Sequence, residues 1–323
     1  MAKSTSAGGI RRFTLAHVSG LGNVTEMKTY DVLCIGSVLW DVIGRSPASM
    51  RLGSDVPGRI TRLPGGVALN IAMTLARFGL RPMLLSAVGR DVEGEELVRR
   101  CAELDLITEM LYRSDDLPTD VYMAIEGANG LIAAIADAHS LEAAGDKILH
   151  PLADGRLGST DAPFAGLIAL DGNLTQALLA QIAGSALFAA ADLRVAPASP
   201  GKAERLLPLL SHPSATLYVN LEEAGLLAKE PFSTAEAAAR GLLARGAARV
   251  LVTDGGNTCA EGTQGQSVIT ATPPQVMVTR VTGAGDTFMA AHIVATRNNA
   301  TRQDALTRAI TAAADYVSGD IET

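Results

Sequence analysis

The chain lacks the features of a disulfide-bonded, zinc-binding or nucleic-acid-binding protein. Its 323 residues include three cysteines, Cys34, Cys101 and Cys259, which are far apart and have no CxxC spacing. This pattern fits free thiols in a reducing cytosol better than a disulfide or zinc framework. The net charge of −7 also argues against a basic face that binds nucleic-acid phosphates. We therefore expect a cytoplasmic protein with no nucleic-acid partner.

Long apolar runs are missing as well. The longest candidate, residues 174–191, is interrupted by Gln176, Gln181 and Gly184, so we expect no transmembrane helix and no membrane partner. The first 28 residues contain no continuous apolar segment of the kind found in signal peptides. We expect residues 1–28 to form a disordered tail.

Aromatic residues make up only 4% of the chain, but hydrophobic residues reach 48%, which is enough for a large core of Ala, Leu and Val. Short apolar runs alternate with segments of helical apolar spacing. This alternation predicts one α/β domain with a mostly parallel sheet covered on both faces. The expected strands are 31–37, 82–89, 166–170, 187–191, 216–219 and 249–253, and the expected helices include 67–78, 94–104, 174–182, 233–245 and 301–318.

One segment breaks the alternation of strands and helices. Residues 120–126 and 131–136 are two short strands joined by a turn that ends in Asn129-Gly130, which is a strong hairpin signal. Residues 57–63 are a candidate third strand beside them. A hairpin within such a chain predicts a small lid over the edge of the sheet rather than a central strand.

The strongest functional signal is the segment Thr282-Gly283-Ala284-Gly285-Asp286. It lies between an expected strand at 276–281 and an expected helix at 288–296. Backbone N–H groups at a glycine-rich helix start form an anion site, and the helix dipole strengthens it. A carboxylate at the mouth of such a site suggests a general base for phosphoryl transfer. The alternative is that Asp286 only caps the helix.

Two motifs in a set order now carry a family resemblance: Pro64-Gly65-Gly66-Val67-Ala68-Leu69-Asn70 and the segment 282–286. IGSVLWD at 35–41, NLEE at 220–223 and TDGG at 253–256 accompany them. The chain resembles the pfkB (ribokinase-like) family of carbohydrate and nucleoside kinases. This resemblance implies a three-layer α/β/α kinase domain over residues 29–323, with a mostly parallel central sheet and a β lid formed by about 56–63 and 119–137.

Within this family the chain is most similar to the kinases that phosphorylate pseudouridine. The similarity rests on residues 57–66, 86–94, 119–125 and 134–137, and on Ala196-Pro197-Ala198-Ser199 ahead of Lys202. It implies transfer of the γ-phosphoryl group of ATP to the 5′-hydroxyl of pseudouridine. The alternative is a related kinase for ribose, a ketose sugar or another nucleoside. A dehydrogenase is disfavoured, because GxGxxG does not follow the first strand.

The resemblance implies roles for the residues around the acceptor hydroxyl. Asp286 would be the base, and the amides of Gly283, Ala284 and Gly285 would stabilise the transferred group. For the remaining candidates a capping, turn or surface role is the open alternative. The implied substrate-binding residues are Asp41, Gly65, Gly66, Asn70, Tyr122 and Asp137.

The resemblance also implies a nucleotide site that binds ATP with Mg²⁺. Glu223 would hold Mg²⁺ through water; the alternative is that Asn220 and Glu223 only form a helix capping box. Arg280 stands where many relatives have an aspartate that belongs to a site for a monovalent cation such as K⁺, which puts that cation in question. The implied ATP-binding residues are Asn220, Thr253, Gly255, Gly256, Thr282, Gly283 and Gly285.

The exposed edge of the lid hairpin suggests a partner for the chain. An unpaired strand edge is a template for pairing with another chain. Several members of the family pair through their lids. We therefore expect a homodimer that forms through the lid.

Overall fold

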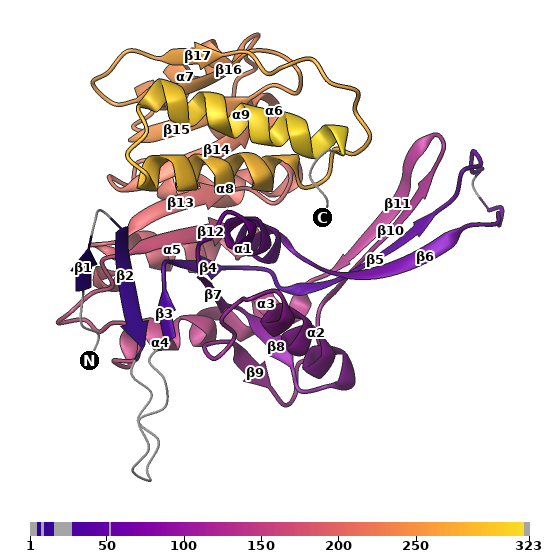
Figure 1. Ribbon diagram of the computed structural model, residues 1–323, viewed down its shortest axis with the longest axis horizontal. Coiled ribbons are helices and arrows are strands. Elements are labelled where there is room, and N and C mark those ends of the chain that lie inside the picture. The colour runs from indigo at the N-terminus through magenta and orange to yellow at the C-terminus, as the bar shows by residue number, and fades with distance from the viewer. Residues whose placement is uncertain (1–4, 8–9, 16–27, 52, 320–323) are drawn as a thin grey trace.

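The computed structural model describes residues 5–7, 10–15, 28–51 and 53–319 (Figure 1). No helix within these ranges is both long enough and apolar enough to cross a bilayer. The chain folds around one large sheet that has helices on both faces, and a long β ribbon projects from one side of it (Figure 1). This arrangement confirms the predicted three-layer α/β/α fold with a β lid.

The central sheet has eight strands, and most of them are parallel. The neighbouring strands from β15 through β7 run parallel to one another, and β16 and β17 are added antiparallel at one edge. In spatial order the strands are β17 (Ile269–Ala271), β16 (Cys259–Thr263), β15 (Arg249–Thr253), β14 (Ala215–Asn220), β13 (Asp192–Ala196), β12 (Leu167–Asp171), β4 (Val32–Ile35) and β7 (Pro82–Leu85).

The two faces of the sheet build two separate cores. In β4, Val32 and Cys34 pack on one side and Leu33 and Ile35 on the other, as the period of a buried strand requires. The first core is closed by α1 (Val67–Arg77), α2 (Val92–Glu103), α8 (Ala284–Arg297) and α9 (Arg302–Ser318). The second is closed by α3 (His139–Ala144), η1 (Gly145–Leu149), α4 (His150–Ala153), α5 (Gln176–Gly184), η2 (Ala186–Phe188), η3 (Pro200–Leu209), α6 (Leu221–Ala228) and α7 (Ala235–Ala244).

The lid is a four-stranded sheet of its own. Its strands, in spatial order, are β11 (Gly130–Asp137), β10 (Val121–Gly127), β5 (Leu39–Arg45) and β6 (Arg59–Gly65). The predicted hairpin and third strand are all present in it. The addition is β5, a strand that the sequence analysis did not predict; it lies at the centre of the lid and pairs parallel with β10 and antiparallel with β6.

Two predicted strands are wrong. Residues 187–191 form the end of η2 and a turn, because Ser185 caps that turn and the strand starts later, as β13. Residues 276–281 form a loop, in which Met277, Val278 and Val281 are 80%, 60% and 70% exposed. Among the described residues this loop pairs with no strand, and the amides of Thr279 and Arg280 instead donate to the Val317 carbonyl at the end of α9.

Part of the segment predicted to be a disordered tail forms strands instead. β1 (Thr5–Ala7), β2 (Ile10–Leu15) and β3 (Lys28–Tyr30) form a small antiparallel sheet. The reason is that β3, which leads directly into β4, offers an edge to β2. The rest of the predicted tail lies outside the described residues. Two further short strands, β8 (Ala87–Gly89) and β9 (Tyr112–Ser114), pair beside α2.

Candidate active site

The candidate site lies at the carboxyl ends of the parallel strands, where ligands bind in open α/β sheets. A cleft of about 690 Å³ opens there between the sheet and the start of α8. It brings together residues that are more than two hundred positions apart in the sequence. Predicted site residues that line it are Asn70, Asn220, Glu223, Thr253, Gly255, Thr282, Gly283, Ala284, Gly285 and Asp286.

The glycine-rich segment forms the start of α8, as the sequence predicted. Gly283 adopts φ 91°, a left-handed conformation that favours glycine, and the helical hydrogen-bond ladder begins when the Thr287 amide donates to the Gly283 carbonyl at 3.0 Å. The amides of Gly285 and Asp286 therefore lie at the positive end of the helix. The Ala284 amide donates to the Val281 carbonyl at 3.1 Å and so holds the turn itself.

Asp286 lies in the first turn of α8 and does not cap it, because the N-cap is Gly283 and has no side-chain cap bond. Its Oδ2 accepts a hydrogen bond from Asn70 Nδ2 of α1 at 3.1 Å. Burial, together with the negative charges of Asp171, Asp41 and Glu223, raises the pKa of Asp286 to about 7, although the Asn70 hydrogen bond opposes this rise. The alternative that Asp286 only caps the helix is thus wrong. A carboxyl with this pKa can accept or release a proton near neutral pH.

Asp41 projects from β5 of the lid toward the two glycines at the start of α1. A side chain at position 65 would place its Cβ 2.0 Å from Asp41 Oδ2, so only glycine leaves room for this carboxylate. Gly66 has φ 99°, and a Cβ there would lie 2.6 Å from the Ser37 carbonyl oxygen. Burial raises the pKa of Asp41 to about 6. The glycines therefore admit both a close backbone turn and a carboxylate.

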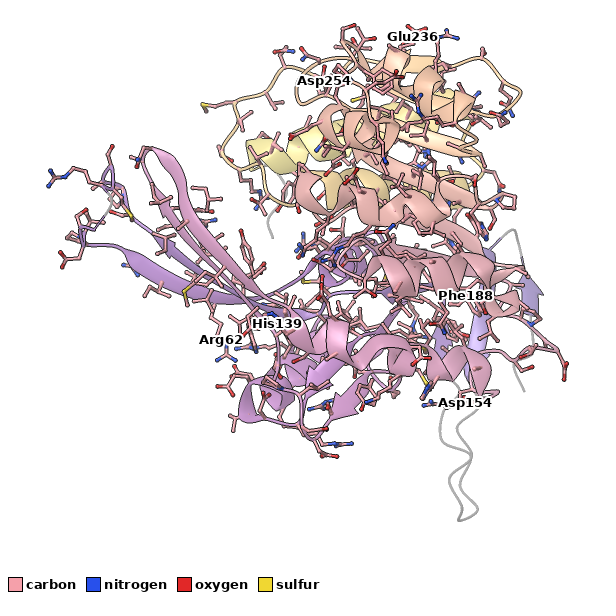
Figure 2. The ribbon with its side chains drawn as sticks, turned by 180° about the vertical axis from the view of Figure 1, so that it is seen from behind. Arg62, His139, Asp154, Phe188, Glu236 and Asp254 are labelled. Atoms are coloured by element: carbon pink, nitrogen blue, oxygen red, sulfur yellow. The ribbon has the colours of Figure 1, made fainter. Side chains whose placement is uncertain are left out.

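Tyr122 shares a face of the lid with Asp41, and Asp137 does not. Tyr122 pairs in register with Asp41, whereas Asp137 pairs with Val121, one residue earlier on β10. Successive residues of a strand point to opposite faces, so Asp137 lies on the other face of the lid. There its Oδ1 contacts Nδ1 of the exposed His139 at 2.8 Å (His139 is labelled in Figure 2). The structure does not bring Asp137 to the site.

The structure adds a residue that the sequence analysis missed, Asp171 at the end of β12. It is fully buried and accepts hydrogen bonds from the amides of Ser37 and Asn173 at 2.8 and 2.7 Å, and from the Ala68 amide at 3.3 Å. One carboxylate therefore ties β4, α1 and β12 together. The signal in the sequence was an acid directly after the expected strand 166–170.

Lys202 belongs to the same network. The sequence analysis quoted it for the family resemblance only, but its Nζ donates to the Asn173 side-chain oxygen, and Asn173 Nδ2 donates to Asp171 at 2.9 Å. Burial and the charge of Arg205 lower the pKa of Lys202. Lys202 is therefore part of the buried frame behind the cleft.

Asn220 and Glu223 form the capping box that the sequence left open as an alternative. The Glu223 amide donates to Asn220 Oδ1, and the Asn220 amide donates to Glu223 Oε2, both at 2.8 Å. Burial, with the charge of Glu222, raises the pKa of Glu223 to about 7 against the effect of the Asn220 amide. No group of three metal-binding side chains exists among the residues that the structure describes. The Glu223 carboxylate, which lines the cleft, nevertheless fits Mg²⁺, because this ion keeps several waters, binds phosphates and needs few protein ligands.

A second cavity, of about 290 Å³, adjoins the cleft. Thr253, Gly255, Gly256 and Gly285 lie in its lining, and most of its other walls are apolar side chains of the 273–281 loop, α8 and α9. Both cavities share Thr253 and the start of α8. Such an apolar cavity beside an anion site suits the base of a nucleotide whose phosphates reach the start of α8.

The residues around position 280 do not fit a monovalent-cation site. Arg280 places its guanidinium 4.0 Å from the centre of the Tyr316 ring and donates from Nε to the Tyr316 carbonyl at 2.7 Å. A cation would meet a like charge here.

Comparisons with known proteins show the family and the fold of the chain. Residues 29–318 match the model of the pfkB family of carbohydrate kinases. Pseudouridine kinase of Escherichia coli K12 is 30% identical over 267 residues, which cover 80% of this chain and 81% of that protein. A carbohydrate kinase from Agrobacterium tumefaciens has a TM-score of 0.75 at 24% identity, with 91% and 92% of the two chains covered. Arabidopsis thaliana ribokinase, solved with ribose and ATP, has a TM-score of 0.73 at 20% identity, with 91% and 94% covered.

Proposed function

This chain belongs to the pfkB family of carbohydrate kinases and is an ATP-dependent phosphotransferase with an alcohol acceptor, and from that premise we propose that it transfers the γ-phosphoryl group of ATP to the 5′-hydroxyl of pseudouridine. The observation that carries the chemistry is the half-buried Asp286 carboxyl at the positive end of α8, held by Asn70. A carboxylate beside an anion site is the pair of groups that in-line phosphoryl transfer needs.

Asp286 is the base in this proposal. The acceptor hydroxyl donates its hydrogen bond to the Asp286 carboxylate, attacks the γ-phosphorus, and passes its proton to Asp286 as the new P–O bond forms and the bond to the ADP oxygen breaks. The raised pKa of Asp286, about 7, makes it a stronger base than an ordinary aspartate and still leaves it largely ionised above neutral pH. The amides of Gly283 and Gly285, with the dipole of α8, stabilise the charge on the transferred group, and Ala284 holds the turn.

Asp41 and Asn70 bind the sugar of the acceptor in this proposal. A carboxylate accepts two hydrogen bonds from a vicinal diol, which matches the 2′- and 3′-hydroxyls of ribose. Gly65 and Gly66 let the sugar approach the backbone, and Tyr122, on the same lid face as Asp41, contacts the base. The lid then shields the reaction from water.

Asn220, Thr253, Gly255, Gly256 and Thr282 surround the nucleotide in this proposal. Glu223 would hold Mg²⁺ through a water, and bound Mg²⁺ would neutralise charge on the phosphates.

The choice of pseudouridine rests on one relative and on the lid. The Escherichia coli pseudouridine kinase aligns with 80% of this chain. The Tyr122 side of the lid offers an aromatic surface for a base, which a free sugar would leave unused. The alternative is a kinase for ribose, a ketose sugar or another nucleoside.

A coupled assay for ADP release tests the substrate. We expect kcat/KM for pseudouridine to exceed that for uridine, adenosine, ribose and fructose by at least tenfold, and phosphorus NMR of the product to show a 5′-monoester. Higher kcat/KM for a free sugar would refute the nucleoside assignment. Tyr122→Phe is the matched variant: if the ring contacts the base, it should keep most of the activity, whereas Tyr122→Ala should raise KM for the nucleoside and leave KM for ATP unchanged.

We also propose that two copies of the chain pair through their lids. The lid face opposite Asp41 carries Ile60, Met123, Ile125 and Ile135, which are 80%, 45%, 42% and 69% exposed. A contiguous exposed apolar face of this kind is typical of an interface. Light scattering should give the mass of a dimer, and Ile135→Lys should give that of a monomer. A monomeric wild type would refute the proposal.

A further inference from the structure

We propose that Arg280 and Tyr316 order the anion loop, residues 279–283 before α8, and that this kinase therefore works without a monovalent cation. We call this pair of side chains the clasp. The clasp joins the last turn of α9 to the segment 279–283, which leads into α8. The inference rests on the proposed role of that loop in phosphoryl transfer. It assigns a positioning function to two residues that contact neither of the proposed substrates.

The first part of the clasp is a set of contacts to the backbone end of α9. Arg280 Nε donates to the Tyr316 carbonyl at 2.7 Å, and the amides of Thr279 and Arg280 donate to the Val317 carbonyl at 2.8 and 3.3 Å. The Thr279 hydroxyl also donates to the Val317 carbonyl, at 3.0 Å. The carbonyls at the end of a helix carry partial negative charge, so a guanidinium is stabilised there.

The second part is the Tyr316 ring, which shapes the anion loop directly. Its hydroxyl donates to the Thr282 carbonyl at 2.9 Å, and a Cβ on Gly283 would lie 2.5 Å from the same hydroxyl oxygen. The left-handed turn at Gly283 is therefore packed against this ring. The Arg280 guanidinium stacks on the ring, 4.0 Å from its centre, which links the two parts.

A guanidinium can do what a bound cation would do at this point. Both supply one positive charge at the end of a helix beside the loop, but the Arg280 guanidinium is held covalently and loses no translational freedom on binding. Its charge also repels a second cation that approaches the loop. The loop is thus ordered in the absence of K⁺, and added K⁺ has little further effect.

Kinetics of the full-length protein in K⁺-free buffer test the inference. With tetramethylammonium as the only other cation, we expect kcat/KM for ATP to change less than twofold when 100 mM K⁺ or Na⁺ is added. Arg280→Ala should lose about tenfold in kcat/KM for ATP, and Tyr316→Phe, which keeps the ring and loses the hydroxyl, about threefold. Arg280→Asp should lose more and regain activity with K⁺.

The matched control is Arg308→Ala, which removes an exposed arginine of α9 that lies eight residues before Tyr316. It should match the wild type in every assay. Hydrogen exchange supplies a readout independent of turnover: amides of residues 283–286 should exchange faster in Arg280→Ala and Tyr316→Phe than in the wild type. Binding of a non-hydrolysable ATP analogue should weaken in the same variants, whichever acceptor the enzyme uses, so an error in the proposed substrate would not hide the result.

Three outcomes would overturn the inference. One is activation of the wild type by K⁺ of tenfold or more. Another is unchanged loop exchange and ATP affinity in Arg280→Ala. The third is full activity in Arg280→Lys and Tyr316→Phe with loss only in Arg280→Ala, which would mean that residue 280 acts on the phosphates as a simple charge rather than as a clasp.

Discussion

Glu261 and Asp286 are both carboxyl groups withdrawn from water on the same side of the central sheet, yet their pKa values move in opposite directions. Burial alone would raise the pKa of Glu261, but His292, Arg249 and Arg302 lower it to about 2. Glu261 Oε1 accepts from Arg249 Nε at 3.0 Å and from Arg302 Nε at 2.9 Å. Among the residues that the structure describes, Asp286 has one side-chain donor, Asn70, and burial raises its pKa to about 7.

The difference separates an acid that holds the fold from one that is available for chemistry. Glu261 ties β15, β16 and α9 together as a permanent anion, and a carboxylate with two arginine partners has no tendency to accept a proton. Asp286 is half-buried, and the charges that act on it come from further acids, so its ionised form is disfavoured. Groups left in this state in a cleft mark functional sites more often than structural ones.

The largest effect is expected on kcat when Asp286 is replaced. Asp286→Asn keeps the shape of the side chain and its contact with Asn70 but removes the proton acceptor, so kcat should fall about a thousandfold or more. ATP binding, measured by calorimetry, should stay within about threefold. A variant that keeps a tenth of the wild-type kcat would show that Asp286 is not the base.

Replacing Glu261 should lower the free energy of unfolding rather than kcat. Glu261→Gln leaves Arg249 and Arg302 without their anion, and we expect the free energy of unfolding to fall by about 3 kcal/mol. Urea unfolding measures this. The matched control is Glu236→Gln, whose ion pair with Arg240 lies on the surface (Glu236 is labelled in Figure 2) and should contribute less than about 0.5 kcal/mol. Equal effects in the two variants would contradict the assignment of Glu261.

The pH dependence of kcat/KM should report the ionisation of Asp286. The base must be ionised, so kcat/KM should rise with pH through an apparent pKa near 7. Asn70→Ala removes a hydrogen bond that favours the ionised form and should move this pKa upward by about one unit. Glu223→Gln removes a neighbouring negative charge and should move it downward. Rates between pH 5 and 9 check both signs; a shift in the same direction for both variants would contradict this account of the Asp286 environment.

The smallest effect concerns the stability of the resting enzyme. Because the folded-state pKa of Asp286 is raised, ionisation disfavours folding, and this loss of stability grows as pH rises from about 4 to about 7. Asp286→Asn should therefore be more stable than the wild type at pH 8, by about 1 kcal/mol or a few degrees in Tm. The gain should vanish near pH 4.

For Glu261 the sign is reversed. Its folded-state pKa is lowered, so its contribution is present above the unfolded value and is lost as pH falls toward 2. A gain of stability for Asp286→Asn that stays the same at pH 4 and pH 8 would refute the link to ionisation of Asp286.

Much of the fold could be predicted from the sequence because its signals are local. Buried strands such as β12 and β15, helices α1 and α9, and the hairpin at Gly130 all have patterns complete within a few residues. The strand β5 escaped prediction because its parallel neighbour, β10, comes from a distant part of the chain, so its pairing leaves no local signal. The segment 276–281 has the residues of a strand, but in the described part of the chain it pairs with no strand, and the amides of Thr279 and Arg280 bond to the end of α9 instead.

The candidate site divides in the same way. The glycine segment before α8 and the Gly65-Gly66 turn were visible, since their backbone requirements lie within the motif itself. Asp171 was not singled out, because its partners Ser37 and Ala68 are more than one hundred positions away. Asp137 was assigned to the site because the sequence could not show which face of the lid it occupies.

By itself, then, the sequence determined which groups this protein brings to its cleft: a carboxylate after two glycines at a helix start, a second glycine turn, and a lid. The tertiary structure alone decided how those groups behave. The pKa of Asp286 depends on burial and on the charges of Asp171, Asp41 and Glu223, which come from three different elements. Desolvation and Coulomb interactions add up over space rather than along the chain, so the local pattern of residues does not contain them.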